Sequence, residues 1–176
     1  MSAIFRTRRL TIRAFKAADA PAVYAMWSDP EVCRYTGDEP ATDLSVIVED
    51  IARWQRVTTG GPGCGFWAVD AYPAGFVGDV YVRPFAEIPG EQEIGWHVSR
   101  PHWGRGYATE AAAAAIRYAH AAGVSRLVAL IDPDHQASLR VAEKAGLLYE
   151  GLSDRYAPGE PTSAVFVSTV PMCTGL

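Results

Sequence analysis

Apolar and polar residues alternate along several short stretches of the chain, which is the pattern of strands that bury one face. Residues 72–75 read Tyr-Pro-Ala-Gly, which is typical of a hairpin turn between two such strands. Residues 127–131 are continuously apolar, which favours a central strand buried on both faces. The predicted strands are residues 8–15, 66–71, 76–83, 93–99, 127–131, 147–156 and 163–170. Those between residues 66 and 99 follow one another closely and predict an antiparallel meander.

Helical patterns occur between these strands. The predicted helices are about ten residues after Asp19, then residues 43–58, 109–123 and 135–145. Asp19 and Thr42 are the expected N-caps of the first two helices, and Gly123 and Gly146 are expected to end the last two. The order of elements predicts a mixed α/β (α+β) fold in a single domain over residues 1–176. Its central sheet should be mostly antiparallel and flanked by helices.

A glycine-punctuated loop comes directly before the alanine-rich helix. Gly104 and Gly106 flank Arg105 and let the backbone approach a ligand closely. The N–H groups that begin a helix lack intrahelical partners and lie at the positive end of its dipole, so the loop is suited to phosphate. A Walker loop would need Lys before Ser or Thr where Tyr107 and the residue after it stand, and a dinucleotide fingerprint would need a small residue at Thr109. The sequence therefore predicts an anion-binding loop of another kind.

Two motifs carry a resemblance to a known family. Residues 103–108, Trp-Gly-Arg-Gly-Tyr-Ala, resemble the pyrophosphate motif of the GNAT superfamily of N-acetyltransferases, with Trp103 where Gln or Arg is usual. Residues 135–147, HQASLRVAEKAGL, are similar to the fourth-helix motif of the RimJ/RimL-like branch, which acetylates alanine at the N-terminus of ribosomal proteins. The opening segment, residues 8–32, also resembles that branch. The resemblance thus covers nearly the whole chain.

The resemblance implies acetyl-CoA as cosubstrate and no metal cofactor. It places cofactor contacts at Trp96, His97, Val98, Gly104, Arg105, Gly106, Tyr107, Ala108, Thr109, His135 and Ser138. In the family the strand over residues 96–98 splays from its neighbour, and its backbone N–H groups stabilise the oxyanion. His135 stands where the branch has an asparagine that contacts the cofactor.

Acetyl transfer to an amine needs a neutral nucleophile, and a general base can supply it. Because alternate residues of a strand share a face, Glu93, Gly95 and His97 should line up together. Glu93 also matches a glutamate of the branch's strand, so it is the first candidate for the base and His97 is the second. An α-amino group has a reference pKa of about 8 and lysine about 10.4, so an α-amine demands less of the base.

The acid that protonates the leaving thiolate is a tyrosine in many GNAT enzymes. The corresponding position here is Ala142. Ser138, which matches a serine of the RimL-like branch, is the replacement that we expect. Tyr107 and Tyr156 are further aromatic candidates, although packing in the core is the favoured role for both.

Composition narrows the choice of partners. The net charge of −4 argues against recognition of nucleic acid through bulk electrostatics. No membrane span is expected, and the N-terminus lacks a secretory signal, so the expected location is cytoplasmic. Cys33, Cys64 and Cys173 are widely separated, which favours reduced thiols over disulfides. Neither an HExxH nor a GxSxG motif is present.

The leading hypothesis is an acetyl-CoA-dependent N-acetyltransferase that acts on a primary amine, with a protein N-terminus slightly preferred. The alternatives are a small-molecule acceptor, such as an aminoglycoside, a polyamine or an amino acid, and a non-catalytic acyl-CoA-binding module. A homodimer is possible because exposed edge strands permit one.

Overall fold

The computed structural model describes residues 4–57, 61–85, 88, 90–156 and 162–170. Within them the strands form one sheet of eight strands in the order β1-β2-β3-β4-β5-β6-β8-β7. All neighbouring strands are antiparallel except β5 and β6, which are joined through a helix and run parallel. The predicted mixed α/β class with a mostly antiparallel sheet is confirmed.

The strands are β1 (Phe5–Arg6), β2 (Leu10–Ala14), β3 (Gly65–Ala71), β4 (Gly75–Pro84), β5 (Gln92–Val98), β6 (Arg126–Ile131), β7 (Leu148–Ser153) and β8 (Ser163–Thr169). The α-helices are α1 (Ala20–Trp27), α2 (Pro30–Cys33), α3 (Leu44–Val57), α4 (Tyr107–Ala121) and α5 (Gln136–Ala145). Two 3₁₀ turns, η1 (Ala17–Asp19) and η2 (Arg100–His102), precede α1 and the glycine loop. Each predicted element is present, with ends shifted by up to three residues; β1 and α2 were not predicted. The expected end of a helix at residue 58, and Cys173, lie outside the described residues.

Both expected N-caps differ in the structure. Asp19 occupies the N-cap position of α1, but its carboxylate accepts hydrogen bonds from the Arg13 guanidinium at 2.7 and 2.9 Å instead of capping the helix. Charge-assisted bonds to a buried guanidinium are stronger than those to a neutral N–H, so the ion pair is favoured over the cap. Thr42 does not cap α3, because Asp43 directly precedes the helix and its carboxylate accepts from the Ser45 N–H at 2.6 Å.

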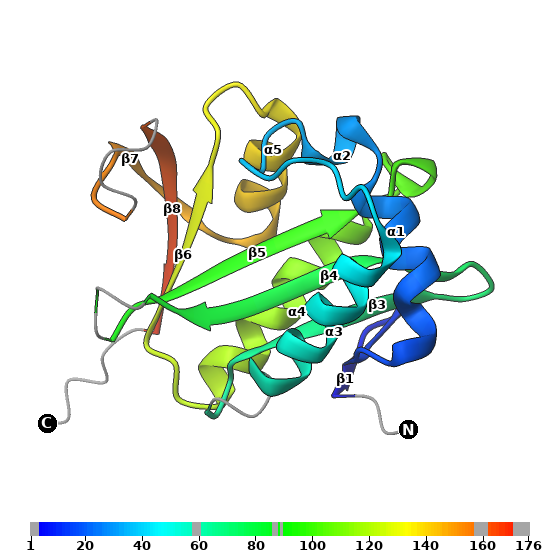
Figure 1. Cartoon of the computed structure of the whole chain (residues 1–176). Helices are drawn as coiled ribbons and strands as arrows, with labels where there is room; N and C mark the ends of the chain where they lie inside the picture. The colour runs from blue at the N-terminus through cyan, green and yellow to red at the C-terminus, as the bar shows by residue number, and fades with distance from the viewer. Residues whose placement is uncertain (1–3, 58–60, 86–87, 89, 157–161, 171–176) are drawn as a thin grey trace, which may run out of the picture.

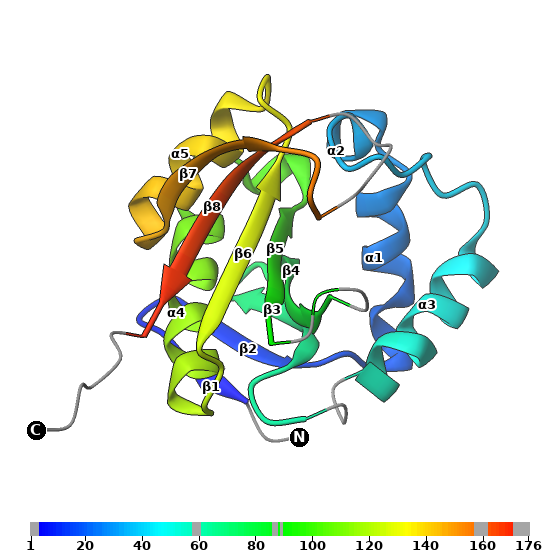
Figure 2. The ribbon, with the colours of Figure 1, turned by 90° about the vertical axis from the view of Figure 1, so that its left-hand side faces the viewer.

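The helices cover both faces of the sheet (Figure 1, Figure 2). In the edge view of Figure 2, α4 and α5 lie on one face, and α1 and α3 lie on the other. The inner face of α4 is made almost entirely of alanine, and Ala115 and Ala119 are fully buried in the main core. Small side chains let a helix axis lie close to a sheet. The alanine-rich sequence therefore fixes α4, and the loop before it, against β5.

The parallel strands β5 and β6 separate soon after they meet. In the described chain they pair only at Gln92 with Leu127 and at Glu93 with Val128. Beyond these pairs β5 continues against β4, and β6 continues against β8, while the two strands diverge from each other (Figure 1). The inner edges of β5 from Ile94 and of β6 from Ala129 therefore bound a wedge that opens through the sheet.

Candidate active site

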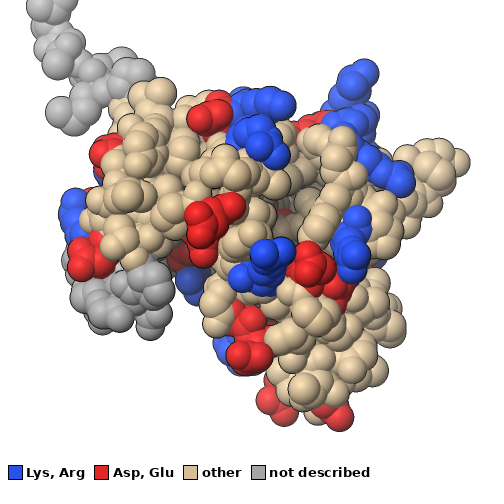
Figure 3. Space-filling model, turned by 90° about the horizontal axis from the view of Figure 1, so that it is seen from above, with Lys and Arg blue, Asp and Glu red and all other residues tan. Residues whose placement is uncertain are grey.

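The wedge is continuous with a large pocket of about 920 Å³. Its lining comes from the end of α1, the segment between α2 and α3, α3 itself, β3 to β6, the segment that leads into the start of α5, and the start of β8. Seen from above, the molecule is hollowed there, and acidic and basic side chains alternate around the hollow (Figure 3). The size is within the range of sites that hold small ligands.

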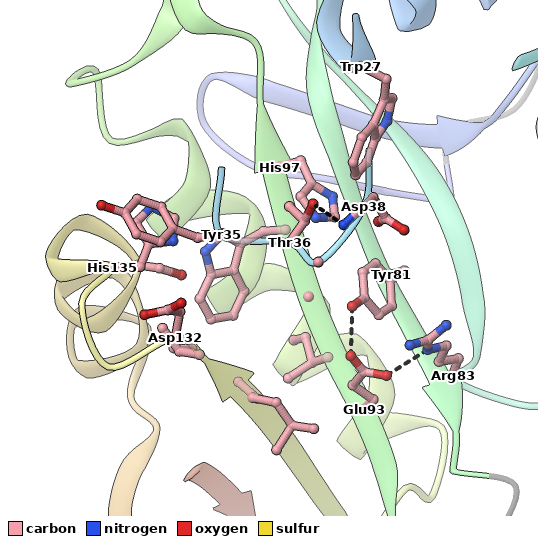
Figure 4. Close-up of a pocket in the computed structure, with 18 of the residues that line it drawn as sticks. Trp27, Tyr35, Thr36, Asp38, Tyr81, Arg83, Glu93, His97, Asp132 and His135 are labelled. Carbon is pink, nitrogen blue, oxygen red and sulfur yellow. Dashed lines mark hydrogen bonds and ion pairs between the residues drawn. The ribbon is translucent and has the colours of Figure 1, made fainter. Parts of the chain in front are cut away.

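Glu93, the first candidate for the base, lies on the pocket wall and is almost completely buried. The Tyr81 hydroxyl donates to one of its carboxylate oxygens at 2.8 Å, and the Arg83 Nε donates to the other at 2.6 Å. Figure 4 shows both side chains converging on Glu93. Burial and the Glu93 charge hold the pKa of Tyr81 well above its usual value, so the phenol remains a hydrogen-bond donor.

His97, the second candidate, is paired with a buried carboxylate. Its Nδ1 lies 2.8 Å from an Asp79 oxygen, and Asp79 is only 3% exposed. A carboxylate accepts here, so Nδ1 carries the hydrogen and Nε2 presents the lone pair. Burial by itself would lower the pKa of His97, but the Asp79 charge and hydrogen bond outweigh it and raise that pKa above its ordinary value. The edge of Trp27 packs against the imidazole, with ring centroids 4.6 Å apart.

The register between β4 and β5 explains this arrangement. Asp79 is opposite His97, Tyr81 is opposite Gly95, and Arg83 is opposite Glu93. A Cβ built on Gly95 would lie 2.3 Å from the Tyr81 ring, so only glycine leaves room for that phenol. The expectation that Glu93, Gly95 and His97 share a face is confirmed, and all three line the pocket.

The glycine loop has the backbone expected for close approach to a ligand. Gly104 and Gly106 have φ of 73° and 77°, in the left-handed region that favours glycine. Gly106 is the N-cap of α4 and has no side chain to satisfy the following N–H groups, those of Tyr107, Ala108 and Thr109. The Trp103 indole N–H donates to the Val98 carbonyl and fastens the loop to the end of β5. These features fit a pyrophosphate group at the wide end of the wedge.

Arg105, one of the expected cofactor contacts, makes a hydrogen bond within the chain. Its guanidinium donates to the Pro101 carbonyl at 3.2 Å, within the loop's own approach segment. The guanidinium close to the glycines is that of Arg9, whose Nη1 donates to the Arg105 carbonyl at 2.9 Å. Arg9 precedes the loop by 96 positions, so sequence spacing gave no sign of this contact.

Residues of α5 form the opposite side of the pocket. His135 directly precedes the helix, and the ring of Tyr35 stacks on it with centroids 4.4 Å apart (Figure 4). Burial lowers the pKa of His135. The charge of Asp132 opposes this shift, and His97 adds to it. Ser138 lines the pocket one turn further along α5.

The position of the family's usual acid and the two aromatic candidates are accounted for by packing. Ala142 is fully buried in the main core. Tyr107 packs against that core and beneath the Arg9 guanidinium, 5.1 Å from the ring centroid. The Tyr156 hydroxyl donates to Glu91 at 2.7 Å, and its ring packs on Phe85, so this tyrosine does not line the pocket.

The sequence analysis missed several groups of the site, among them Trp27 and Tyr35, which line the pocket, and two residues of β4, Asp79, which pairs with His97, and Tyr81. Only the last two left a signal, because Asp79, Tyr81 and Arg83 alternate along the predicted strand over residues 76–83. The alternation places these residues beside Glu93 and His97 only if the register between β4 and β5 is known, and the loop between the two strands does not fix that register. Trp27 and Tyr35 come from α1 and from the segment after α2, and only tertiary packing brings them to the site.

Neither a metal-binding cluster nor a membrane-spanning helix is found in the described part of the chain. Over the described ranges, no group of three or more His, Cys, Asp and Glu side chains is placed to hold a metal ion. None of the helices in the part of the chain that the structure describes is long and apolar enough to cross a membrane.

Comparisons with known proteins agree with this geometry. Residues 9–148 match the acetyltransferase (GNAT) domain family. The chain is 32% identical over 151 residues to the uncharacterized protein YkkB of Bacillus subtilis (strain 168), covering 81% of this chain and 84% of that protein. It is 29% identical over 151 residues to the uncharacterized N-acetyltransferase p20 of Bacillus licheniformis, covering 85% of each.

A solved structure of RimL, described as a ribosomal L7/L12 alpha-N-protein acetyltransferase in complex with coenzyme A, shares the fold. Its TM-score is 0.80 over 96% of this chain and 98% of that one, at 17% identity. The family match spans well over half of the sequence and includes the wedge and the glycine loop. The chain therefore belongs to the GNAT acetyltransferase family and is an acetyl-CoA-dependent N-acetyltransferase.

Proposed function

We propose that this N-acetyltransferase acetylates the α-amine of a protein N-terminus, with His97 as the general base. The observation that carries the proposal is that His97, on the pocket wall, is paired with the buried Asp79. An imidazole with a raised pKa is matched to an α-amine, whose reference pKa is about 8, much better than to a lysine at about 10.4. RimL, a protein of the same fold, is described as acting on such an α-amine.

His97 is preferred to Glu93 because of what each side chain already binds. Both carboxylate oxygens of Glu93 are engaged by Tyr81 and Arg83. In the His97 imidazole only Nδ1 has a hydrogen-bond partner among the described residues, which leaves Nε2 for a substrate proton. Glu93 would then act as a fixed negative charge that attracts the ammonium form of the acceptor into the pocket. That Glu93 is the base instead stays a prediction. The pH profiles of the Glu93 and Asp79 variants in the Discussion distinguish it from the proposal for His97.

The residues of the wedge and the loop would hold acetyl-CoA, which supplies the acetyl thioester. The N–H groups of the left-handed glycine loop and of the first turn of α4 would bind the pyrophosphate. The inner edge of β5 from Trp96 to Val98 would donate backbone hydrogen bonds, including one to the developing oxyanion. His135 and Ser138 would contact the cofactor from α5, and Ser138 remains the candidate acid.

A comparison of acceptors tests the substrate class. We would supply acetyl-CoA with a lysine-free peptide that has a free α-amine, with the same peptide blocked at its N-terminus and carrying one lysine, and with a set of amino acids, polyamines and aminoglycosides. The proposal expects turnover on the first peptide and little on the second. Turnover confined to the small amines would establish the small-molecule alternative. Binding of acetyl-CoA with no turnover on any amine would indicate an acyl-CoA-binding module.

Three further expectations remain predictions beside this proposal. These are the organisation of residues 1–176 as one domain, a cytoplasmic location, and a possible homodimer. A sedimentation measurement of the purified protein would decide the last of them.

A further inference from the structure

Arg9, in the turn between β1 and β2, reaches the glycine loop from a distant part of the sequence. Its Nη1 donates to the Arg105 carbonyl at 2.9 Å. The guanidinium also lies over the ring of Tyr107, the first residue of α4, and Nη2 would lie 3.4 Å from a Cβ built on Gly106. One cation therefore contacts the loop at Arg105 and the helix start at Tyr107, and lies beside Gly106 between them.

Glu110 holds this cation in place. Its carboxylate accepts from the Arg9 Nε at 2.6 Å, from the Arg9 backbone N–H at 3.0 Å and from the Thr7 hydroxyl at 2.6 Å. Burial by itself would raise the pKa of Glu110, but these hydrogen bonds and the Arg9 charge lower it, so the carboxylate stays ionised. Because Glu110 belongs to the first turn of α4, the network fixes the β1–β2 turn to the helix start.

The contact with the Arg105 carbonyl determines where the next N–H points. The peptide bond between Arg105 and Gly106 is trans, and in a trans peptide the C=O and N–H groups point in opposite directions. A carbonyl held by Arg9 therefore turns the Gly106 N–H away from Arg9. A glycine at a φ of 77° has no Cβ to resist the reverse orientation, so the hydrogen bond from Arg9 is what selects this one.

We propose that Arg9 is a positioning residue for cofactor phosphate. It keeps the Arg105 carbonyl out of the anion site and aims the Gly106 N–H into it, and its positive charge lies beside the loop. The proposal rests on the proposed binding of the acetyl-CoA pyrophosphate at this loop.

Binding of CoA and of pantetheine, which lacks the phosphates, tests the proposal. Affinities would be measured by calorimetric titration for CoA and by competition for pantetheine. For Arg9→Gln we expect the Kd of CoA to rise about tenfold or more, with the Kd of pantetheine unchanged. Lysine at this position can still reach a carbonyl but lacks the planar guanidinium, so the Kd of CoA for Arg9→Lys should lie between those of the wild type and Arg9→Gln. Arg8→Gln, at an exposed neighbouring arginine, is the matched control and should bind CoA like the wild type.

Each other result has a definite meaning. Unchanged CoA affinity in Arg9→Gln would overturn the proposal, and so would an equal loss for both ligands, because a general structural defect affects them alike. Glu110→Gln provides a second test, since it weakens the hold on Arg9 and should raise the Kd of CoA by a smaller factor in the same direction. If the wild type itself binds CoA no better than pantetheine, the phosphate loop assignment fails, and the proposal for Arg9 fails with it.

Discussion

The protonation of one side chain, His97, controls the proposed chemistry at the residue scale. The imidazole accepts a proton only when it is neutral, so kcat/KM should rise as the pH increases through the His97 pKa. In Asp79→Asn that pKa should fall, because burial then acts without its main opposing charge, while Asp38 and Glu93 still raise it. We expect the rise to move to lower pH. The plateau should drop about 10²-fold or more as the ring loses its fixed tautomer.

Glu93→Gln is the matched control for the pH profile. With one acceptor used throughout, ionisation of the substrate amine affects every variant equally and leaves the difference between them interpretable. If His97 is the base, Glu93→Gln should lower kcat/KM without removing the rise. A profile that loses its rise in Glu93→Gln and is unmoved in Asp79→Asn would assign the base to Glu93.

At the scale of elements, the glycine loop and α4 act as one unit. A glycine at each end of α4 allows the cost of backbone strain to be measured separately from the loss of CoA binding. Gly106 at the start of α4 and Gly123 just after its end both have left-handed φ, 77° and 98°. Alanine at either position should cost about 1–2 kcal/mol in the free energy of unfolding. Only Gly106→Ala should also weaken CoA binding, because only that glycine belongs to the loop. Chemical denaturation and titration with CoA measure the two effects.

Two outcomes of the comparison between these variants would contradict the prediction. Equal loss of CoA affinity in Gly106→Ala and Gly123→Ala would mean that the helix as a whole, and not its glycine loop, determines binding. Unchanged affinity in both would remove the phosphate site from this end of α4.

Which features could be predicted from the sequence depends on how far apart along the chain the interacting residues lie. Strands and helices were predicted because alternation and helical spacing are local, and the glycine loop was predicted because the backbone demand is met by Gly104 and Gly106 themselves. The side-chain capping bonds at the helix N-termini were not, because Asp19 is bound by Arg13 through tertiary packing and because Asp43 is nearer to α3 than Thr42. Arg9 and Asp79 were missed for the same reason: their partners, Arg105 and His97, are brought to them only by the folded sheet.

At the scale of the whole molecule, the two parts of the sheet are joined by a short ladder. The strands β1 to β5 meet β6 to β8 at two residue pairs in the described chain, with α4 and α5 packed on one face. Within the described residues, the inner edges of β5 and β6 beyond those pairs have no partner strand, and they should open locally more easily than β3, which is paired on both sides. A ligand that fills the wedge would supply the missing backbone partners.

Hydrogen exchange with and without CoA tests this view of the sheet. A saturating ligand slows exchange through global unfolding everywhere, by about 100-fold at 100 times Kd, which corresponds to about 2.7 kcal/mol. At short labelling times, however, only locally opening segments have exchanged, so the early effect of CoA should be confined to residues 94–98 and 104–109. NAD should leave both segments unchanged. Early protection elsewhere, with none in these two segments, would place the cofactor outside the wedge and would require another explanation for the divergence of β5 from β6.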